Sequence, residues 1–199
     1  MGKAVLILGF KDLFHHRETA SLEEALLARV EQGGISSLVV EGNLPAEAQA
    51  SATALALIRK YTPDRVLLVS TAKGASAVGL QRLAIRPQTY PQTADDGLFT
   101  TIPLRQAHAA LGHAEIPASI SDDLVDGTDN DVVYSILDFA AKHKSTFTCG
   151  WLRVPLSVQQ AFELHSSSTY ADKEVERRAF PSMAISTIAD AMFAVVSHS

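Results

Sequence analysis

Short apolar runs alternate with helical patterns in the first part of the chain and predict strands and helices in turn. An unbroken aliphatic run suits a parallel strand that is covered on both faces. A helix is predicted from Ser21 to Gln32, because Ser21-Leu22-Glu23-Glu24 matches a capping box. A second helix is predicted from Pro45, which suits the first turn of a helix, to Tyr61. The strands predicted in this part are Lys3–Leu8, Ile35–Val40 and Val66–Ser70.

The same alternation continues to the end of the chain, but two polar segments interrupt it. Pro87–Thr101 has no period and is predicted to be a long loop, and Leu164–Arg178 is a polar stretch before the last helix. The strands predicted here are Leu80–Ile85, Ala118–Ser121 and Thr146–Val154, and the helices are Pro103–Leu111, Asn130–Lys142 and Ser186–Val196.

This order of elements predicts a three-layer α/β/α sandwich with a largely parallel, twisted sheet. A chain of 199 residues fits one domain of ordinary size. The sequence has no internal repeat and no linker-like segment. We therefore expect residues 1–199 to form a single domain.

Composition excludes several classes of function. The net charge is −5 and the 17 basic residues are scattered, which argues against a nucleic-acid partner. The apolar runs are far shorter than the roughly 20 residues of a membrane span. The first residues lack a signal-peptide pattern, so we expect a cytoplasmic protein that does not bind membranes. No metal or nucleotide motif is present, and we expect neither a metal nor a cofactor.

Several short motifs occur along the chain in a fixed order. The motifs are Gly9-Phe10, Pro63-Asp64-Arg65-Val66, Gln81-Arg82-Leu83-Ala84-Ile85, Thr101-Ile102-Pro103, Ile116–Ser121, Gly150-Trp151-Leu152-Arg153-Val154-Pro155 and Pro181-Ser182-Met183. The ordered set matters more than any one motif. Together the motifs resemble the pyrrolidone carboxyl peptidase (pyroglutamyl peptidase) family of α/β cysteine peptidases, and the resemblance implies the sandwich fold expected above.

The resemblance implies a Cys–His–Glu catalytic triad, but this sequence has other residues at all three positions. The nucleophilic Cys of the family aligns with Asp129, the general-base His with Arg153 and the orienting Glu with Gln81. Asn130 and Tyr134 match the family's Cys-Asn-x-x-x-Tyr pattern. No catalytic residue of the family is therefore intact here.

These replacements remove the chemistry of a cysteine peptidase, which needs a thiolate, a base and a group that orients the base. A carboxylate at 129 is a poor nucleophile toward an amide. Arg153 cannot give up a proton, and Gln81 has no charge to stabilise an imidazolium. We therefore interpret the chain as a pseudoenzyme of the family that acts by binding a small ligand or a protein. We also predict an ion pair between Asp129 and Arg153.

Two enzymatic alternatives stay open. A hydrolase of pyroglutamyl or related amides would use Asp129 as nucleophile or base and Arg153 as oxyanion stabiliser. An ordinary thiol peptidase would need Cys149, the only cysteine, which lies in a predicted strand and is expected to be a buried structural thiol.

The resemblance also implies where a ligand and a second subunit would bind. The family's pocket aromatics correspond to Phe10 and to Leu13, beside which Phe14 offers a substitute. With Arg153, these residues would line a pocket for a small polar or acidic ligand. By analogy with the family, Pro87–Thr100 would mediate a homo-oligomer.

Overall fold

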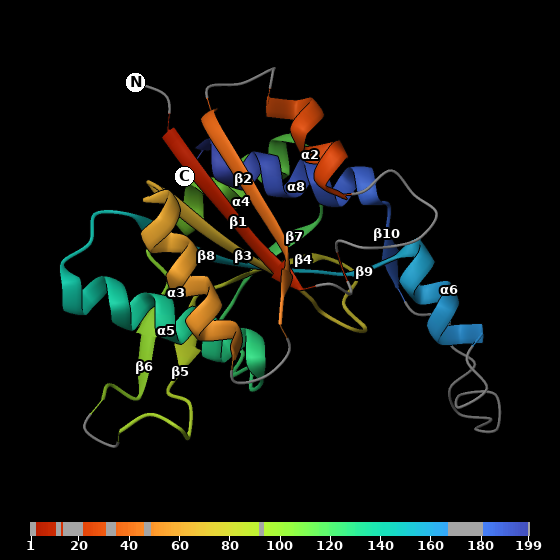
Figure 1. Cartoon of the computed structure of the whole chain (residues 1–199). Helices are drawn as coiled ribbons and strands as arrows, with labels where there is room; N and C mark the ends of the chain where they lie inside the picture. The colour runs from red at the N-terminus through yellow and green to blue at the C-terminus, as the bar shows by residue number, and fades with distance from the viewer. Residues whose placement is uncertain are drawn as a thin grey trace.

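The computed structural model describes residues 3–10, 13, 22–30, 35–45, 49–91, 94–166 and 181–198. Its centre is a six-stranded sheet in the order β2-β1-β3-β8-β4-β7 (Figure 1). All neighbouring pairs in this sheet are parallel except β4–β8, so the predicted largely parallel sheet is confirmed. The strands are β1 (Lys3–Phe10), β2 (Ile35–Leu44), β3 (Arg65–Thr71), β4 (Val78–Gln81), β7 (Ala118–Ser121) and β8 (Thr148–Val154).

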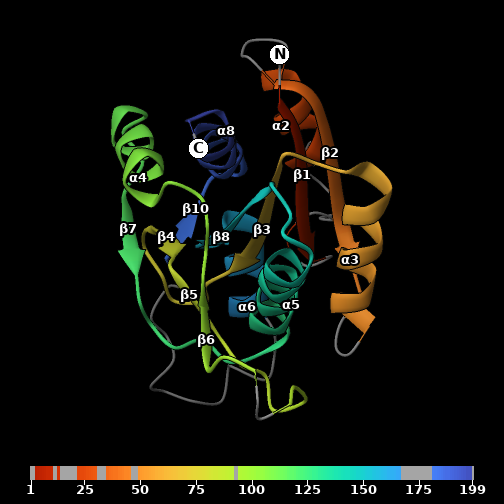
Figure 2. The same ribbon diagram turned by 90° about the vertical axis from the view of Figure 1, so that its left-hand side faces the viewer.

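Helices cover both faces of this sheet, as an α/β/α sandwich requires (Figures 1 and 2). One face carries α2 (Leu22–Val30), α4 (Leu104–His113) and α8 (Ile185–His198), and the other carries α3 (Gln49–Tyr61) and α5 (Thr128–His143). Side chains alternate along each strand, so Leu6 and Leu8 belong to the α3–α5 core and Val5 and Ile7 to the other core. Among the described residues, no helix is both long and apolar enough to cross a bilayer.

The prediction of one strand over Leu80–Ile85 is wrong. The central sheet ends at Gln81, and Leu83–Ile85 (β5) pairs antiparallel with Gly97–Phe99 (β6) in a separate two-stranded sheet. Part of the predicted Pro87–Thr101 loop is therefore a strand. A three-residue strand is too short to show a hydrophobic period, which is why the sequence did not indicate it.

A second small sheet and a helix follow β8, and the sequence analysis did not predict them. Leu156–Ser157 (β9) pairs with Ser182–Met183 (β10), and Val158–Ser166 forms α6. The helix begins with a capping box, in which the Ser157 N–H donates to Gln160 Oε1 (2.7 Å) and the Gln160 N–H donates to Ser157 Oγ (3.1 Å). The Ser-x-x-Gln pattern of Ser157 and Gln160 was the sequence signal that indicated the start of α6. Residues 167–178 of the predicted polar stretch Leu164–Arg178 lie outside the described residues.

Asn130 fastens the start of α5 to β5. Its Oδ1 accepts the N–H of Ile85 (2.8 Å), its Nδ2 donates to the carbonyl of the same residue (2.9 Å), and its side chain is 1% exposed. Further along α5, the Tyr134 hydroxyl donates to the carbonyl of Asp95 (2.6 Å). These bonds fix the position of the helix N-terminus relative to the segment that follows Gln81.

Replacing this amide should destabilise the fold. In Asn130→Ala both backbone groups of Ile85 lose a partner, so we expect the free energy of unfolding to fall by roughly 2–4 kcal/mol. Urea denaturation followed by circular dichroism measures this change. The control Gln106→Ala removes an exposed amide from α4 and should stay within about 0.5 kcal/mol of wild type. Equal stability of the two variants would contradict the anchoring role.

Candidate functional site

The pairing of β4 with β8 brings two of the three predicted site residues together. Gly79 lies opposite Arg153 and Gln81 lies opposite Trp151, so Gln81 and Arg153 are diagonal neighbours. Diagonal neighbours in an antiparallel pair point to the same face and have Cα atoms about 7–8 Å apart. Trp151 and Cys149, which share the face of Arg153, pack in the core beneath α3 and α5. Gln81 and Arg153 therefore lie on the face that α5 covers.

Asp129 lies in the first turn of α5, on the same side of the sheet. The helix begins after Gly127, whose φ of 127° is in the region that favours glycine. Asp129 Oδ1 accepts the N–H of Asn130 (3.0 Å), so its carboxylate stays at the helix end, where the helix dipole favours a negative charge. Burial raises the pKa of the neighbouring Asp131, and the carboxylates of Asp126 and Asp129 add to this effect.

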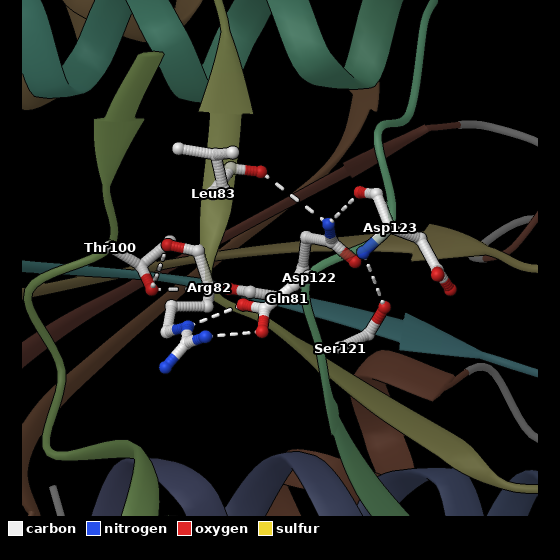
Figure 3. Close-up of polar contacts among 7 residues, drawn as sticks. All are labelled: Gln81, Arg82, Leu83, Thr100, Ser121, Asp122 and Asp123. Atoms are coloured by element: carbon white, nitrogen blue, oxygen red, sulfur yellow. Dashed lines mark hydrogen bonds and ion pairs between the residues drawn. The ribbon is translucent and has the colours of Figure 1, made fainter.

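The amide of Gln81 is completely buried, and its orientation is fixed. Nε2 donates to the carbonyl oxygens of Leu83 (3.5 Å) and Asp123, the second of which belongs to the segment that leads into α5 (Figure 3). Because only the nitrogen can face two carbonyl oxygens, Oε1 must point elsewhere. Oε1 is buried and has no hydrogen-bond partner among the described residues.

Backbone positions around Gln81 are held by polar contacts that the sequence analysis missed. Thr100 Oγ1 donates to the Gln81 carbonyl (3.1 Å), and Arg82 forms a two-point ion pair with Asp122 (Figure 3). Behind the site, Trp151 Nε1 donates to Ser70 Oγ (3.0 Å). The partners of Gln81 are backbone carbonyls, which carry no signal in the sequence, so only the fold could reveal them.

The predicted ion pair between Asp129 and Arg153 is wrong. Among the residues that the structure describes, ion pairs join Arg29 to Asp190, Arg82 to Asp122, Arg86 to Asp96 and Lys142 to Asp138, and none joins Asp129 to Arg153. The Asp129 carboxylate is instead engaged by the N–H at its own helix end. Arg153 is partly buried, and its Nε is fully buried without a hydrogen-bond partner in the described part of the chain.

The single cysteine is buried, as the sequence predicted. Cys149 lies in β8 with 0% exposure, and its backbone N–H donates to Thr101 Oγ1 (2.8 Å). Burial raises the pKa of its thiol to about 12. Burial therefore disfavours the thiolate form of Cys149, as expected for a buried structural thiol.

Of the three hydrophobic residues predicted to line a pocket, the two that the structure describes pack on opposite faces of the sheet. Phe10 ends β1 and packs on the α3–α5 core, which is also the face of Arg153. Leu13 is 3% exposed and belongs to the core on the opposite face of the sheet. Phe14 lies outside the described residues. Of this set, only Phe10 is placed on the face that carries Gln81 and Arg153.

Solved structures with a similar fold include pyroglutamyl peptidases. Pyroglutamyl peptidase I from Bacillus amyloliquefaciens has a TM-score of 0.75 at 22% sequence identity, over 100% of this chain and 95% of that chain. A mutant pyrrolidone carboxyl peptidase from Pyrococcus furiosus also has a TM-score of 0.75 at 22% identity, over 97% of this chain and 96% of that chain. The fold is therefore that of this class of α/β peptidases.

Sequence comparison leads to the same family. The profile of the family described as pyroglutamyl peptidase matches residues 87–197. A pyrrolidone-carboxylate peptidase of Deinococcus radiodurans is 30% identical over 176 residues, which are 79% of this chain and 80% of the relative. Pyrrolidone-carboxylate peptidase 1 of Caldanaerobacter subterraneus is 26% identical over 125 residues, 55% of this chain and 62% of the relative. The chain belongs to the pyroglutamyl peptidase family.

The contacts of Gln81 predict that a glutamate at this position would be poorly accommodated. A Gln81→Glu carboxylate would face two carbonyl oxygens, so burial and repulsion should raise its pKa above the usual value of about 4.3. The folded variant would then hold a proton that the unfolded chain releases, so the free energy of unfolding should fall as pH rises. Urea denaturation at pH 4.5 and pH 7.5 tests this.

At pH 7.5 we expect Gln81→Glu to lose roughly 1–3 kcal/mol relative to wild type, and part of this loss should be regained at pH 4.5. The control Gln81→Met also loses both donated hydrogen bonds but cannot ionise. Its deficit relative to wild type should be similar at the two pH values. If the free energy of unfolding of Gln81→Glu at pH 7.5 equalled that of wild type, the Gln81 amide would not be required for stability.

Proposed function

We propose that this member of the pyroglutamyl peptidase family is not a thiol peptidase and binds a small polar or acidic ligand on the face between β4, β8 and α5. The observation that carries the proposal is the state of Cys149. It is the only cysteine in the sequence, and it is fully buried with a pKa of about 12. Covalent catalysis by a cysteine requires a thiolate that the substrate can reach.

The residues at the triad positions support the same conclusion. Arg153 keeps its proton at every physiological pH and cannot act as a general base. Gln81 uses its amide to hold two backbone carbonyls, which is a structural role. The site therefore offers hydrogen-bond donors and a positive charge. It offers no proton acceptor at position 153, where the family has its general-base histidine.

Unused binding capacity supports the ligand-binding part of the proposal. The Arg153 guanidinium makes no ion pair or hydrogen bond with the described residues, and the buried Gln81 Oε1 also has no partner there. Unsatisfied buried polar groups are costly, so a bound molecule that pairs with them gains affinity.

Self-association through Pro87–Thr100 stays a prediction. The 64% exposure of the Phe99 side chain supports it, because an exposed aromatic residue is available for contact with a second copy of the chain.

A second candidate is hydrolysis by a changed mechanism, with Asp129 as nucleophile or base and Arg153 stabilising the oxyanion. The observation in its favour is that Arg153 does not neutralise the Asp129 carboxylate through an ion pair. The Asn130 N–H donates to Oδ1 of this carboxylate and not to Oδ2. Hydrolysis by this mechanism would differ from thiol catalysis because it would depend on the residue at position 129 and not on Cys149.

An activity assay tests the proposal directly. We expect no turnover of a fluorogenic pyroglutamyl amide by the purified protein above the no-enzyme rate. A triple variant with Asp129→Cys, Arg153→His and Gln81→Glu restores the residues of the family triad. Turnover by this variant would confirm the assignment of the three positions, provided that circular dichroism shows it to be folded.

Two single variants separate the alternatives if the natural protein does turn over the substrate. Activity lost in Cys149→Ala would overturn the proposal in favour of ordinary thiol catalysis. Activity kept in Cys149→Ala but lost in Asp129→Asn would establish the changed hydrolytic mechanism.

The burial of Cys149 also predicts how the native protein reacts with thiol reagents. Modification of Cys149 by a water-soluble disulfide reagent at pH 8 should be limited by opening of the structure, because neither the sulfur nor its thiolate is available in the folded state. We expect a reaction at least 10³-fold slower than in 6 M guanidinium chloride, measured by absorbance. A native rate close to the denatured rate would contradict a buried thiol.

A further inference from the structure

We propose that the peptide bond between Asp126 and Gly127 is a site of spontaneous covalent modification, at which the backbone changes from an aspartyl to an isoaspartyl linkage. The site lies in the segment that joins β7 to α5 (Figure 2). The sequence contains a second Asp-Gly pair, Asp96-Gly97, which the fold holds differently. The inference is independent of the proposed binding function, because it involves neither a ligand nor the side chains at the triad positions.

The reaction needs only the two residues and water. The Gly127 nitrogen attacks Cγ of Asp126 and closes a five-membered succinimide ring, and the carboxyl hydroxyl leaves as water with the amide proton. Water then adds to one of the two ring carbonyls. Attack at the backbone carbonyl of Asp126 opens the ring so that the chain continues through Cγ, which is the isoaspartyl form. Attack at Cγ restores aspartate, and either route leaves the mass of the protein unchanged.

The reacting groups are already close in the folded protein. The Gly127 N–H donates to Asp126 Oδ1 at 2.9 Å. Oδ1 is bonded to Cγ, so the same contact brings the nitrogen next to the carbon that it attacks. Holding reacting atoms about 3–3.5 Å apart removes much of the entropic cost of a reaction. Both residues are exposed, so water can reach the ring and hydrolyse it.

Gly127 offers little steric resistance to ring closure. Its φ of 127° lies in the region that favours glycine. Apart from its chain neighbours, a Cβ at this position would meet only Asp129 Oδ1, at 3.4 Å. The first hydrogen bond of α5 uses the carbonyl of Gly127, which accepts the N–H of Asp131 (3.1 Å). The nitrogen that attacks is therefore not the group that starts the helix.

The second Asp-Gly pair is held in a way that opposes the reaction. The Asp96 carboxylate is bound to the Arg86 guanidinium (2.9 Å), which directs it away from its own backbone. The Arg86 N–H also donates to the Asp96 carbonyl (2.8 Å), and Gly97 pairs with Ile85 in the β5–β6 sheet. Ring closure would have to turn this peptide out of the strand. The fold, and not the dipeptide alone, therefore distinguishes the two positions.

An isoaspartyl linkage at Asp126 would disturb the start of α5. It adds one carbon atom to the main chain between two anchored points. On one side, the Asp123 carbonyl accepts a hydrogen bond from Gln81 Nε2. On the other side, Asn130 is bonded to both backbone groups of Ile85. A longer connection between fixed ends must displace one of them, so we expect the isomerised protein to unfold at a lower temperature than the unmodified protein.

Incubation in ¹⁸O-labelled water tests the proposal, because each passage through the ring introduces one oxygen atom from water. The full chain is kept folded at pH 6 and 37 °C for four weeks, digested in ordinary water and analysed by mass spectrometry. Electron-based fragmentation locates the label and distinguishes isoaspartate from aspartate. We expect ¹⁸O and isoaspartate at position 126, with at least tenfold more label there than at position 96.

Two controls separate the fold from the dipeptide. In 6 M guanidinium chloride the two Asp-Gly pairs should take up label at rates within about threefold of each other, because unfolding removes the contacts that distinguish them. Asp126→Glu keeps the charge and the exposed position but would have to close a six-membered ring. This variant should lose the label at position 126 and leave position 96 unchanged.

The native protein alone can overturn the inference. Absence of label at position 126 after four weeks would do so, and so would equal labelling of positions 126 and 96 in the folded chain. Label at position 126 that persists in Asp126→Glu would also contradict it, since the oxygen would then enter by another route. None of these readouts depends on ligand binding or on turnover of a substrate, so failure of the proposed function would leave this result unaffected.

Discussion

The antiparallel pairing of β4 with β8, next to the edge strand β7 of an otherwise parallel sheet, is the constraint on which the candidate site depends. It places Gly79 opposite Arg153 and sets Gln81 one diagonal step away. The chain then leaves the sheet at Arg82 to form β5, and Asn130 bonds both backbone groups of Ile85. The same few residues therefore fix the strand register, the exit of the chain and the position of the helix that carries Asp129.

The site differs from a catalytic triad in its physical character as well as in its residue types. A cysteine peptidase joins its nucleophile and base by proton transfer, so the two groups must be in contact. Here Asp129 is bound at its own helix end, Gln81 is bound to two carbonyls, and Arg153 is not paired with either. The three side chains behave as separate groups. Gln81 Oε1 and Arg153 Nε are left without hydrogen-bond partners in the described part of the chain.

Much of the fold could be predicted from the sequence, because long hydrophobic periods determine long elements. Ala118–Ser121 was predicted with its observed bounds, and the strands and helices with clear periods were placed within a few residues. The break at Arg82 was not predictable from periodicity, since β5 and β6 are each three residues long. The helix Val158–Ser166 did carry a signal, the Ser157–Gln160 capping box, which the sequence analysis overlooked.

The site could be predicted only in part, because sequence gives residue positions but not the contacts that compete for each side chain. Complementary charges at 129 and 153 suggested an ion pair. The fold instead offers Asp129 a backbone N–H at the helix start, and the pairing does not form. The partners of Gln81 are carbonyl oxygens brought together by the β4–α5 geometry, and no sequence pattern encodes them.

The most direct test of this account is a crystal structure of the ligand-free protein at a resolution that shows ordered water. We predict Gln81 Nε2 within hydrogen-bond distance of the Leu83 and Asp123 carbonyls, and a water or small molecule that contacts both Gln81 Oε1 and Arg153 Nε. An ion pair between Arg153 and Asp129, together with a protein donor on Gln81 Oε1, would contradict it. The site would then be satisfied internally and would have no group left to bind a ligand.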